Sequence, residues 1–152
     1  ASGDHVEIVK ICVDLGATEF TEAACNAAED DRFAATLFLL NKGADANAVG
    51  LTAAAADHVD IVHLAHAKGA TNNDEMLEAA AAADVENIAV WCIIWGVKSP
   101  NGAIGEVAHA GMERAVKMSI EYGATDLEYA RDAARDAGFD ELSSWLETKM
   151  AA

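Results

Sequence analysis

Three histidines lie within one short apolar stretch and raise the question of a metal site. His63 and His66 are three residues apart, so both would lie on the same side of a helix, and His58 comes about one turn earlier. Zinc sites commonly combine histidine with cysteine ligands, and no cysteine lies nearby in the sequence. His58 also has a counterpart in His5, because the segment that begins DHV at 57 repeats the segment that begins DHV at 4. At this repeated position the histidine ring is expected to hold a turn in place. We therefore expect no metal site.

The acidic residues show no pattern typical of catalysis. Pairs such as Asp30-Asp31 and Asp140-Glu141 fall in expected turns and helix starts, where a carboxylate interacts favourably with the helix dipole. The segment DANAVG (45–50) resembles part of a calcium-binding loop but lacks the later ligands. The chain contains no nucleophile elbow, phosphate-binding loop, dinucleotide fingerprint or H-E-x-x-H motif. The sequence thus predicts a protein that is not an enzyme and binds no cofactor.

The three cysteines are expected to be reduced core residues of an intracellular protein. Cys12, Cys25 and Cys92 are an odd number without CxxC spacing, and each lies in an apolar helical pattern. No apolar run approaches the ~18 residues that a membrane-spanning helix needs, so we expect no membrane insertion. No signal peptide is recognisable at the N-terminus. Because the chain begins with Ala1 in the middle of a repeated phrase, we expect a processed or partial chain.

The chain is strongly acidic, with 26 acidic and 10 basic side chains and a formal net charge of −16. Such a surface repels nucleic acid and anionic lipid, which argues against direct binding to either. The charge favours a partner protein with a basic patch. Alternatively, it serves only solubility or adaptation to a salty environment, and the sequence leaves both explanations open.

Five glycines recur at a nearly constant interval and indicate the elements that position these residues. They are Gly16, Gly43, Gly69, Gly96 and Gly123, separated by 27, 26, 27 and 27 residues. Before each glycine, apolar residues at helical spacing form a stripe wider than half of a helix, which needs cover on two sides. A glycine just beyond such a helix readily adopts the left-handed conformation that ends it. Long helices are therefore expected at 5–15, 32–42, 58–68, 85–95, 112–122 and 139–149.

A second, shorter helix is expected after each glycine. These segments are rich in alanine, which lets neighbouring helices approach closely, and Thr18, Thr71 and Thr125 are candidate N-caps. Turns at one fixed register lead into the next long helix, at Asp4, Asp31, Asp57, Asp84, Gly111 and Gly138. Because no helix pair buries its apolar faces alone, the copies must stack into an all-α solenoid. The sequence predicts one domain over 1–152: a partial repeat at 1–16, repeats at 17–43, 44–69, 70–96 and 97–123, and a C-terminal repeat or cap at 124–152.

Two phrases carry a family resemblance. DHVEIVKICVDLGAT (4–18) and DHVDIVHLAHAKGAT (57–71) resemble the G-H-x-E-I-V-x-x-L-L-x-x-G-A phrase of ankyrin repeats, and the match covers essentially the whole chain. The period of 26 or 27 residues is shorter than the ankyrin period of about 33, and the T-P-L-H opening is absent. This compression predicts ankyrin-like repeats with short or absent β-hairpin fingers. In this form the chain is most similar to the repeats that giant DNA viruses carry in many copies.

The resemblance implies a role in protein recognition, as a scaffold or adaptor. It would place the protein in the cytoplasm, or in the host cytoplasm or the virion if the source is viral. The alternative is a structural component or linker of a large assembly, such as a virion or an organelle complex. In that case the long apolar ridges would also pack between subunits.

Two candidate surfaces for the partner compete. Carboxylates near the starts of the shorter helices recur in one register and would align along one acidic edge: Glu19, Glu22, Asp74, Glu75, Asp126 and Glu128. The competing surface is an apolar contact centred on Trp95 and Tyr122, which share the position before the glycine. Trp91 shares its position with Phe38 and other apolar residues, so we expect it in the core. Trp145 is expected to seal the last helix.

The stretch WGVKSPNGAIGEVAHAG (95–111) is the most divergent copy. Gly102 and Gly105 each weaken a helix by about 1 kcal/mol relative to alanine, and SPNG is typical of a turn. We expect either sequence drift within a tolerant stack or, alternatively, a bend or recognition loop.

Overall fold

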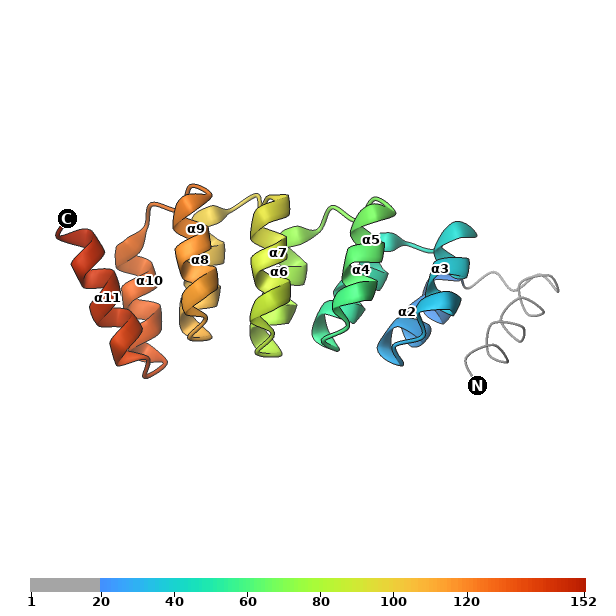
Figure 1. The fold of residues 1–152 in the computed structure, drawn as a ribbon, viewed down its shortest axis with the longest axis horizontal. Coiled ribbons are helices and arrows are strands. Elements are labelled where there is room, and N and C mark those ends of the chain that lie inside the picture. Colours follow the sequence, from blue (N-terminus) through green and yellow to red (C-terminus); the bar gives the residue numbers. More distant parts are fainter. Residues whose placement is uncertain (1–19) are drawn as a thin grey trace. The chain divides into compact units, whose positions relative to one another are not determined.

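A computed structural model describes residues 20–152 of the chain. Over this range the protein contains ten α-helices and no strand, which confirms the all-α prediction for these residues (Figure 1). The expected helix at 5–15 lies outside the described residues. So do several single positions discussed above: Asp4, His5, Cys12, Gly16, Thr18 and Glu19.

The helices alternate between the first and the second member of a pair. The first helices are α2 (Phe20–Glu29), α4 (Ala46–Ala55), α6 (Asn73–Ala82), α8 (Pro100–His109) and α10 (Leu127–Asp136). The second helices are α3 (Phe33–Asn41), α5 (Val59–Ala67), α7 (Glu86–Trp95), α9 (Glu113–Glu121) and α11 (Asp140–Met150). The second helices match the long helices predicted over 32–149 to within a residue or two.

The first helices are not shorter than most of the second helices. Each has 10 residues, as many as or more than α3, α5, α7 and α9, so their description as the shorter helices was wrong. α4 begins at Ala46, five residues before its run of leucine, threonine and alanine at 51–56, because Asp45 caps it by accepting a hydrogen bond from Asn47 N. The predicted threonine cap at Thr125 was also wrong, because Asp126 caps α10 through Tyr129 N. Thr71 does not cap α6 either, since that helix begins two residues later, at Asn73.

The chain forms two compact units, residues 1–72 and 73–152. In the described part of unit 1, α2 packs on α3 and α4 on α5, while α2 contacts α4 and α3 contacts α5. In unit 2, the pairs are α6 with α7, α8 with α9, and α10 with α11. The first helices α6, α8 and α10 pack in a row, and α7 packs on α9. Each unit is therefore a two-layer stack of consecutive helix pairs, as a helical repeat requires.

Glycine ends the second helices in the way that the repeat predicts. Gly43, Gly69, Gly96 and Gly123 have φ between +101° and +108°, a region that side-chain-bearing residues rarely adopt. Gly43 N donates to Leu40 O and Ala44 N donates to Leu39 O, the paired bonds of a Schellman motif. The same pair of bonds recurs around Gly69 and Gly123, and in each case the following alanine is buried.

The first helices also end at a residue with positive φ, in the turns that the sequence predicts. These turns are the second kind of helix stop in the repeat, beside the glycines that end the second helices. Asp31, Asp57 and Asp84 have φ of 56°, 63° and 59°, and the glycines Gly111 and Gly138 occupy the same register. Aspartate tolerates this left-handed conformation better than most residues. His58, next to one of these turns, contacts the preceding pair: its Nε2 lies 2.9 Å from Glu29 O, and its Nδ1 lies 3.6 Å from the Asp31 carboxylate. The expected turn-holding role of His58 is thereby confirmed.

The divergent copy forms a complete helix rather than a loop. Ser99 caps α8 by accepting a hydrogen bond from Gly102 N, and Pro100 occupies the first helical position, where its missing N–H is harmless. SPNG is therefore a helix start in this protein. The connections between helix pairs, such as 42–45 and 96–99, are short and contain no strand within the described residues.

Candidate interaction surfaces

The acidic edge predicted from the sequence is interrupted within unit 2. Asp74 and Glu75 lie at the start of α6, and Asp126 and Glu128 lie at the start of α10. α8, which packs between these two helices, has no acidic residue in its first turn. Glu22 is exposed on α2 of unit 1. The structure therefore does not bring the four carboxylates of unit 2 together.

Two of these carboxylates have structural roles. The Asp74 oxygens accept hydrogen bonds from Lys98 N at 2.8 Å and Ser99 N at 3.1 Å, in the connection between α7 and α8. Asp126 caps α10, as described above. Glu75 and Glu128 are exposed, and Glu128 lies 3.6 Å from the Arg131 guanidinium. Glu75 and Glu128 are thus exposed carboxylates that cap no helix and hold no connection.

Asp74 is one of four polar side chains at the same repeat position that the sequence analysis missed, two in each unit. Each member lies near the start of a first helix and accepts backbone N–H groups from the connection that follows the next helix. Thr21 accepts from Asp45 N, Asn47 from Thr71 N, and Asn101 from both Thr125 N and Asp126 N. We call this repeat position the connection clamp: Thr21, Asn47, Asp74 and Asn101. Their spacing of 26 or 27 residues was a signal that could have revealed them.

The aromatic candidates are exposed to different degrees. Tyr122 is 49% exposed at the end of α9, and Trp95 is half-buried at the end of α7. Trp91 is 39% exposed, so its predicted place in the core was wrong. Its ring stacks on that of Trp95, with the centroids 5.9 Å apart.

The position of Trp91 within the repeat explains the error. The same register holds Phe38, Leu64, Met118 and Trp145, and all four are only half-buried. The buried rows of the second helices lie at neighbouring positions, as Ile88 and Cys92 show. Trp145 lies under two cations, Lys117 Nζ at 5.3 Å and Lys149 Nζ at 5.4 Å from the ring centroid. This position of the second helices therefore carries a large, partly exposed apolar side chain in each repeat of the described residues.

A small groove lies on the first-helix layer of unit 2. Its volume is about 170 Å³, and it is lined by Asp74, Leu77 and Glu78 of α6, Ser99, Gly102, Ala103 and Glu106 of the α8 region, and Tyr129 of α10. The Tyr129 ring lies against Gly105, where a Cβ would be 2.0 Å from Tyr129 Cε1. Gly105 thus permits a close contact, which sequence drift alone does not explain.

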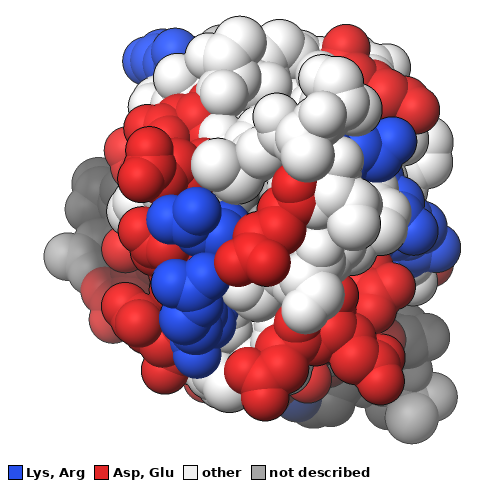
Figure 2. Space-filling model, turned by 90° about the vertical axis from the view of Figure 1, so that its left-hand side faces the viewer, with Lys and Arg blue, Asp and Glu red and all other residues white. Residues whose placement is uncertain are grey.

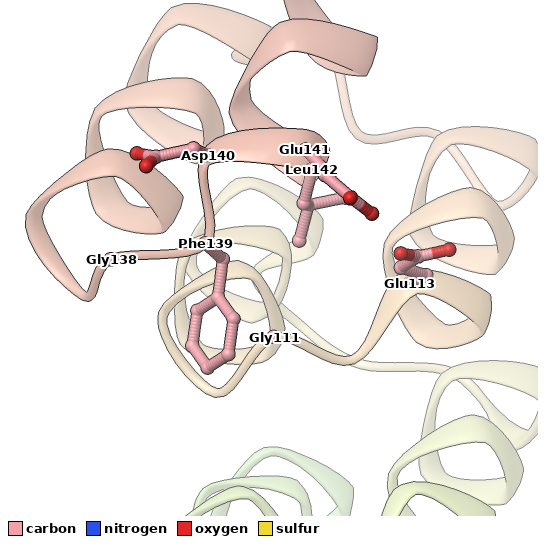
Figure 3. Close-up of a pocket in the computed structure, with 7 residues that line it drawn as sticks. All are labelled: Gly111, Glu113, Gly138, Phe139, Asp140, Glu141 and Leu142. Carbon is pink, nitrogen blue, oxygen red and sulfur yellow. The ribbon is translucent and has the colours of Figure 1, made fainter.

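A larger opening of about 460 Å³ lies at the starts of α9 and α11, beside the Gly111 turn. Figure 3 shows the Phe139 ring against Gly111, with Asp140 directed away from Glu113 and Glu141. The carboxylates therefore do not converge on one point. In unit 1, His63 lines a separate depression with Phe33 and Asp60. Within residues 20–152, no group of three or more His, Cys, Asp or Glu side chains is arranged to hold a metal ion.

Charge on the C-terminal end of unit 2 is mixed. Figure 2 shows acidic and basic side chains interleaved on this end, with uncharged surface between them. Arg135 lies 2.8 Å from Glu147 of α11 and 3.5 Å from Asp132, and Arg131 lies 2.7 Å from Asp132. The basic side chains of α10 are therefore used within the protein.

The two described cysteines differ in burial. Cys92 is buried, and this burial, with a smaller contribution from the negative charge of Asp74, raises the pKa of its thiol from 9.0 to about 12. Cys92 is thus a core residue, as predicted, whereas Cys25 is half-buried.

The helices are also short by membrane standards. Among the described residues, none has the length and apolar character that crossing a lipid bilayer requires.

No protein-family model matches the chain, and no curated protein matches it either.

Proposed function

We propose that this protein is a non-enzymatic interaction module: a stack of ankyrin-like helix pairs that binds another protein through its acidic outer surface. The observation that carries this proposal is the placement of the carboxylates. Over residues 20–152 every Asp and Glu is at least partly exposed. The inner faces of the helices are filled by alanine and branched aliphatic side chains, which hold the pairs together. The carboxylates that another molecule could contact therefore lie on the outer surface.

The ankyrin-like assignment is supported by the local geometry of the repeat. Each unit stacks helix pairs, and four second helices end in a glycine with positive φ. A buried alanine follows three of these four glycines. That arrangement agrees with the Gly-Ala step of the ankyrin phrase. The short connections leave the helices themselves, rather than hairpin fingers, as the recognition surface.

The kind of partner follows from how the charges are used. Several basic side chains are engaged within the protein: Lys68 with Asn41, Arg114 with Asn87, and Arg32 with Asp30. Because every Asp and Glu of residues 20–152 is at least partly exposed, the acidic excess of this range lies on the surface. A protein with a basic patch is attracted by this field, whereas nucleic acid is repelled. The proposal includes a location inside a cell, or inside a host cell or virion if the source is viral.

Salt dependence tests this proposal. Candidate partners can be obtained by affinity purification with the chain as bait, and each is then purified and titrated by calorimetry or interferometry. We expect the affinity to fall by about tenfold or more between 0.1 M and 1 M salt, because the Debye length shrinks from ~10 Å to ~3 Å. Partner affinities that are equal at both salt concentrations would refute an acidic recognition surface.

A second candidate function is supported by the exposed aromatic side chains of unit 2. Trp91 and Tyr122 present large apolar areas to solvent on α7 and α9. Such side chains would pack between subunits if the protein were a component or linker of a large assembly. Light scattering during size-exclusion chromatography separates the two functions. A monomer at micromolar concentration supports the adaptor, whereas obligate self-association supports the assembly component.

A further inference from the structure

The groove between α6 and α8 combines negative charge with an aromatic ring. Asp74 and Glu78 lie on its α6 side, Glu106 lies on its α8 side, and Tyr129 reaches it from α10. No basic side chain lines it. Within the described residues, neither Glu78 nor Glu106 takes part in an ion pair, and both are exposed.

The structure holds two walls of the groove in fixed positions. Asp74 accepts a backbone N–H with each of its two oxygens, so its carboxylate cannot swing away without losing both bonds. Tyr129 is 48% exposed, yet its ring lies against the bare backbone of α8 at Gly105. Any side chain at 105 would displace the ring, because its Cβ would lie 2.0 Å from Tyr129 Cε1. The ring therefore offers the rest of its surface to solvent beside the carboxylates.

We propose that this groove binds an arginine side chain of the partner protein. The inference rests on the proposed function, because it names the chemistry of the partner at one place on the acidic surface. Three carboxylates around one groove favour a cation over a neutral side chain. A planar guanidinium stacks on an aromatic ring and forms paired hydrogen bonds to a carboxylate, which an ammonium group does less well.

The size of the groove agrees with this occupant. An apolar cavity of about 150 Å³ accepts benzene. The groove has about 170 Å³, which is enough for a guanidinium and the methylenes next to it. Leu77 and Ala103 form the nearly buried floor of the groove, and the exposed Tyr129 ring supplies the apolar surface for those methylenes. The phosphates of a nucleic acid are repelled by the same carboxylates that attract arginine.

The direct test uses a short glycine-serine peptide with one central arginine as the probe. The isotope-labelled full chain is titrated with this peptide and followed by amide resonances in NMR spectra. Matched peptides carry lysine or citrulline, which is neutral and similar in shape to arginine, at the same place. We expect the arginine peptide to shift resonances at 74–78, 102–106 and 129, with an affinity about threefold above that of lysine. Equal binding of the citrulline peptide would overturn the proposal.

Matched variants separate this groove from general attraction to an acidic protein. The double variant Glu78→Gln, Glu106→Gln should weaken arginine binding by about tenfold, as the loss of charge-assisted hydrogen bonds predicts. The control is Glu113→Gln, Glu141→Gln, which removes the same charge beside the other opening of unit 2 and should leave the affinity within about twofold. Equal losses in the two double variants would overturn the proposal.

Gly105→Ala provides a variant that keeps every charge. It displaces the Tyr129 ring and should weaken binding of the arginine peptide more than binding of the lysine peptide. Circular dichroism of the variant checks whether its helices are intact. The two proposals fail in different ways. If a partner binds with the expected salt dependence but tolerates both Glu78→Gln and Glu106→Gln, the groove proposal is wrong and the protein-binding function stands. If the arginine peptide binds in the groove but no partner protein binds the chain, the groove recognises arginine and the protein-binding function is wrong.

Discussion

The connection clamp makes a specific prediction about Asp74. Replacing Asp74 with alanine removes the acceptor for Lys98 N and Ser99 N, at 2.8 and 3.1 Å. A hydrogen bond to a charged acceptor contributes about 1.5–3 kcal/mol when buried, but Lys98 and Ser99 are exposed, so water replaces much of this interaction. An N-cap provides a closer comparison, at about 1 kcal/mol per bond. We expect Asp74→Ala to lower the free energy of unfolding by about 2 kcal/mol.

Asparagine at the same position should be almost harmless. Asn101 shows why, because its single amide oxygen accepts both Thr125 N at 2.8 Å and Asp126 N at 3.0 Å. Asp74→Asn should therefore change the free energy of unfolding by no more than about 0.5 kcal/mol. Glu75→Ala is the matched control, since it removes a charge from the same helical turn without removing a clamp bond. It too should stay within about 0.5 kcal/mol.

Urea unfolding followed by circular dichroism measures these differences. For a chain of this size, 2 kcal/mol corresponds to about 4–8 °C in the thermal midpoint, which thermal scans can check. If Asp74→Asn is as damaging as Asp74→Ala, the negative charge rather than the acceptor geometry stabilises the connection. If Glu75→Ala matches Asp74→Ala, the effect belongs to the helix start in general, and the clamp has no special role.

Four further predictions follow from features described above. Gly69→Val should destabilise by about 1–3 kcal/mol in urea unfolding because its φ of +101° is strained for valine, whereas Asp57→Asn at φ of 63° should be neutral. Ile88→Ala should lower the free energy of unfolding by about 2–5 kcal/mol and Trp91→Ala by only about 1 kcal/mol, since Ile88 is buried and Trp91 is not. A larger loss for Trp91→Ala than for Ile88→Ala would show that Trp91 is a core residue. The Cys92 thiol should resist a thiol reagent at pH 8 until the protein unfolds, and a reaction as fast as that of free cysteine would contradict its burial. Because its folded pKa of about 12 exceeds its unfolded value of 9.0, the unfolded state loses the proton first, so stability should fall between pH 9 and 12, and less so in Cys92→Ala.

The second helices and their stops could be predicted from the sequence because the signals are local. A glycine after an apolar stripe specifies both the end of the helix and the conformation that ends it, and Gly43, Gly69, Gly96 and Gly123 all have positive φ. The starts of the first helices were less accessible. They depend on caps such as Asp45 and Ser99, whereas the prediction relied on runs of alanine.

The surface was harder to predict than the helices. Whether Trp91 is covered depends on how far the next second helix extends over it, and the shared apolar register does not contain that information. Asp74 was identified as a surface carboxylate, but its backbone partners lie 24 and 25 residues away in the chain. Tyr129 and Gly105 form a contact between two helices that neither residue indicates alone.

The two stops in each repeat also limit how far a change of chain length can spread. Gly43 and Gly69 are 26 residues apart rather than 27, and α4 begins three residues after Gly43, where α6 begins four residues after Gly69. The missing residue was therefore absorbed by the connection, while α4 kept its 10 residues and Thr21 still reaches Asp45 N at 3.0 Å. A helix without such stops would rotate by about 100° for each residue lost, which would turn its apolar stripe away from its neighbours. The stops that follow the first and second helices thus confine an insertion or deletion to a single connection between helices. Repeats of this kind can therefore diverge, lengthen or be duplicated without losing the register of the repeats that follow.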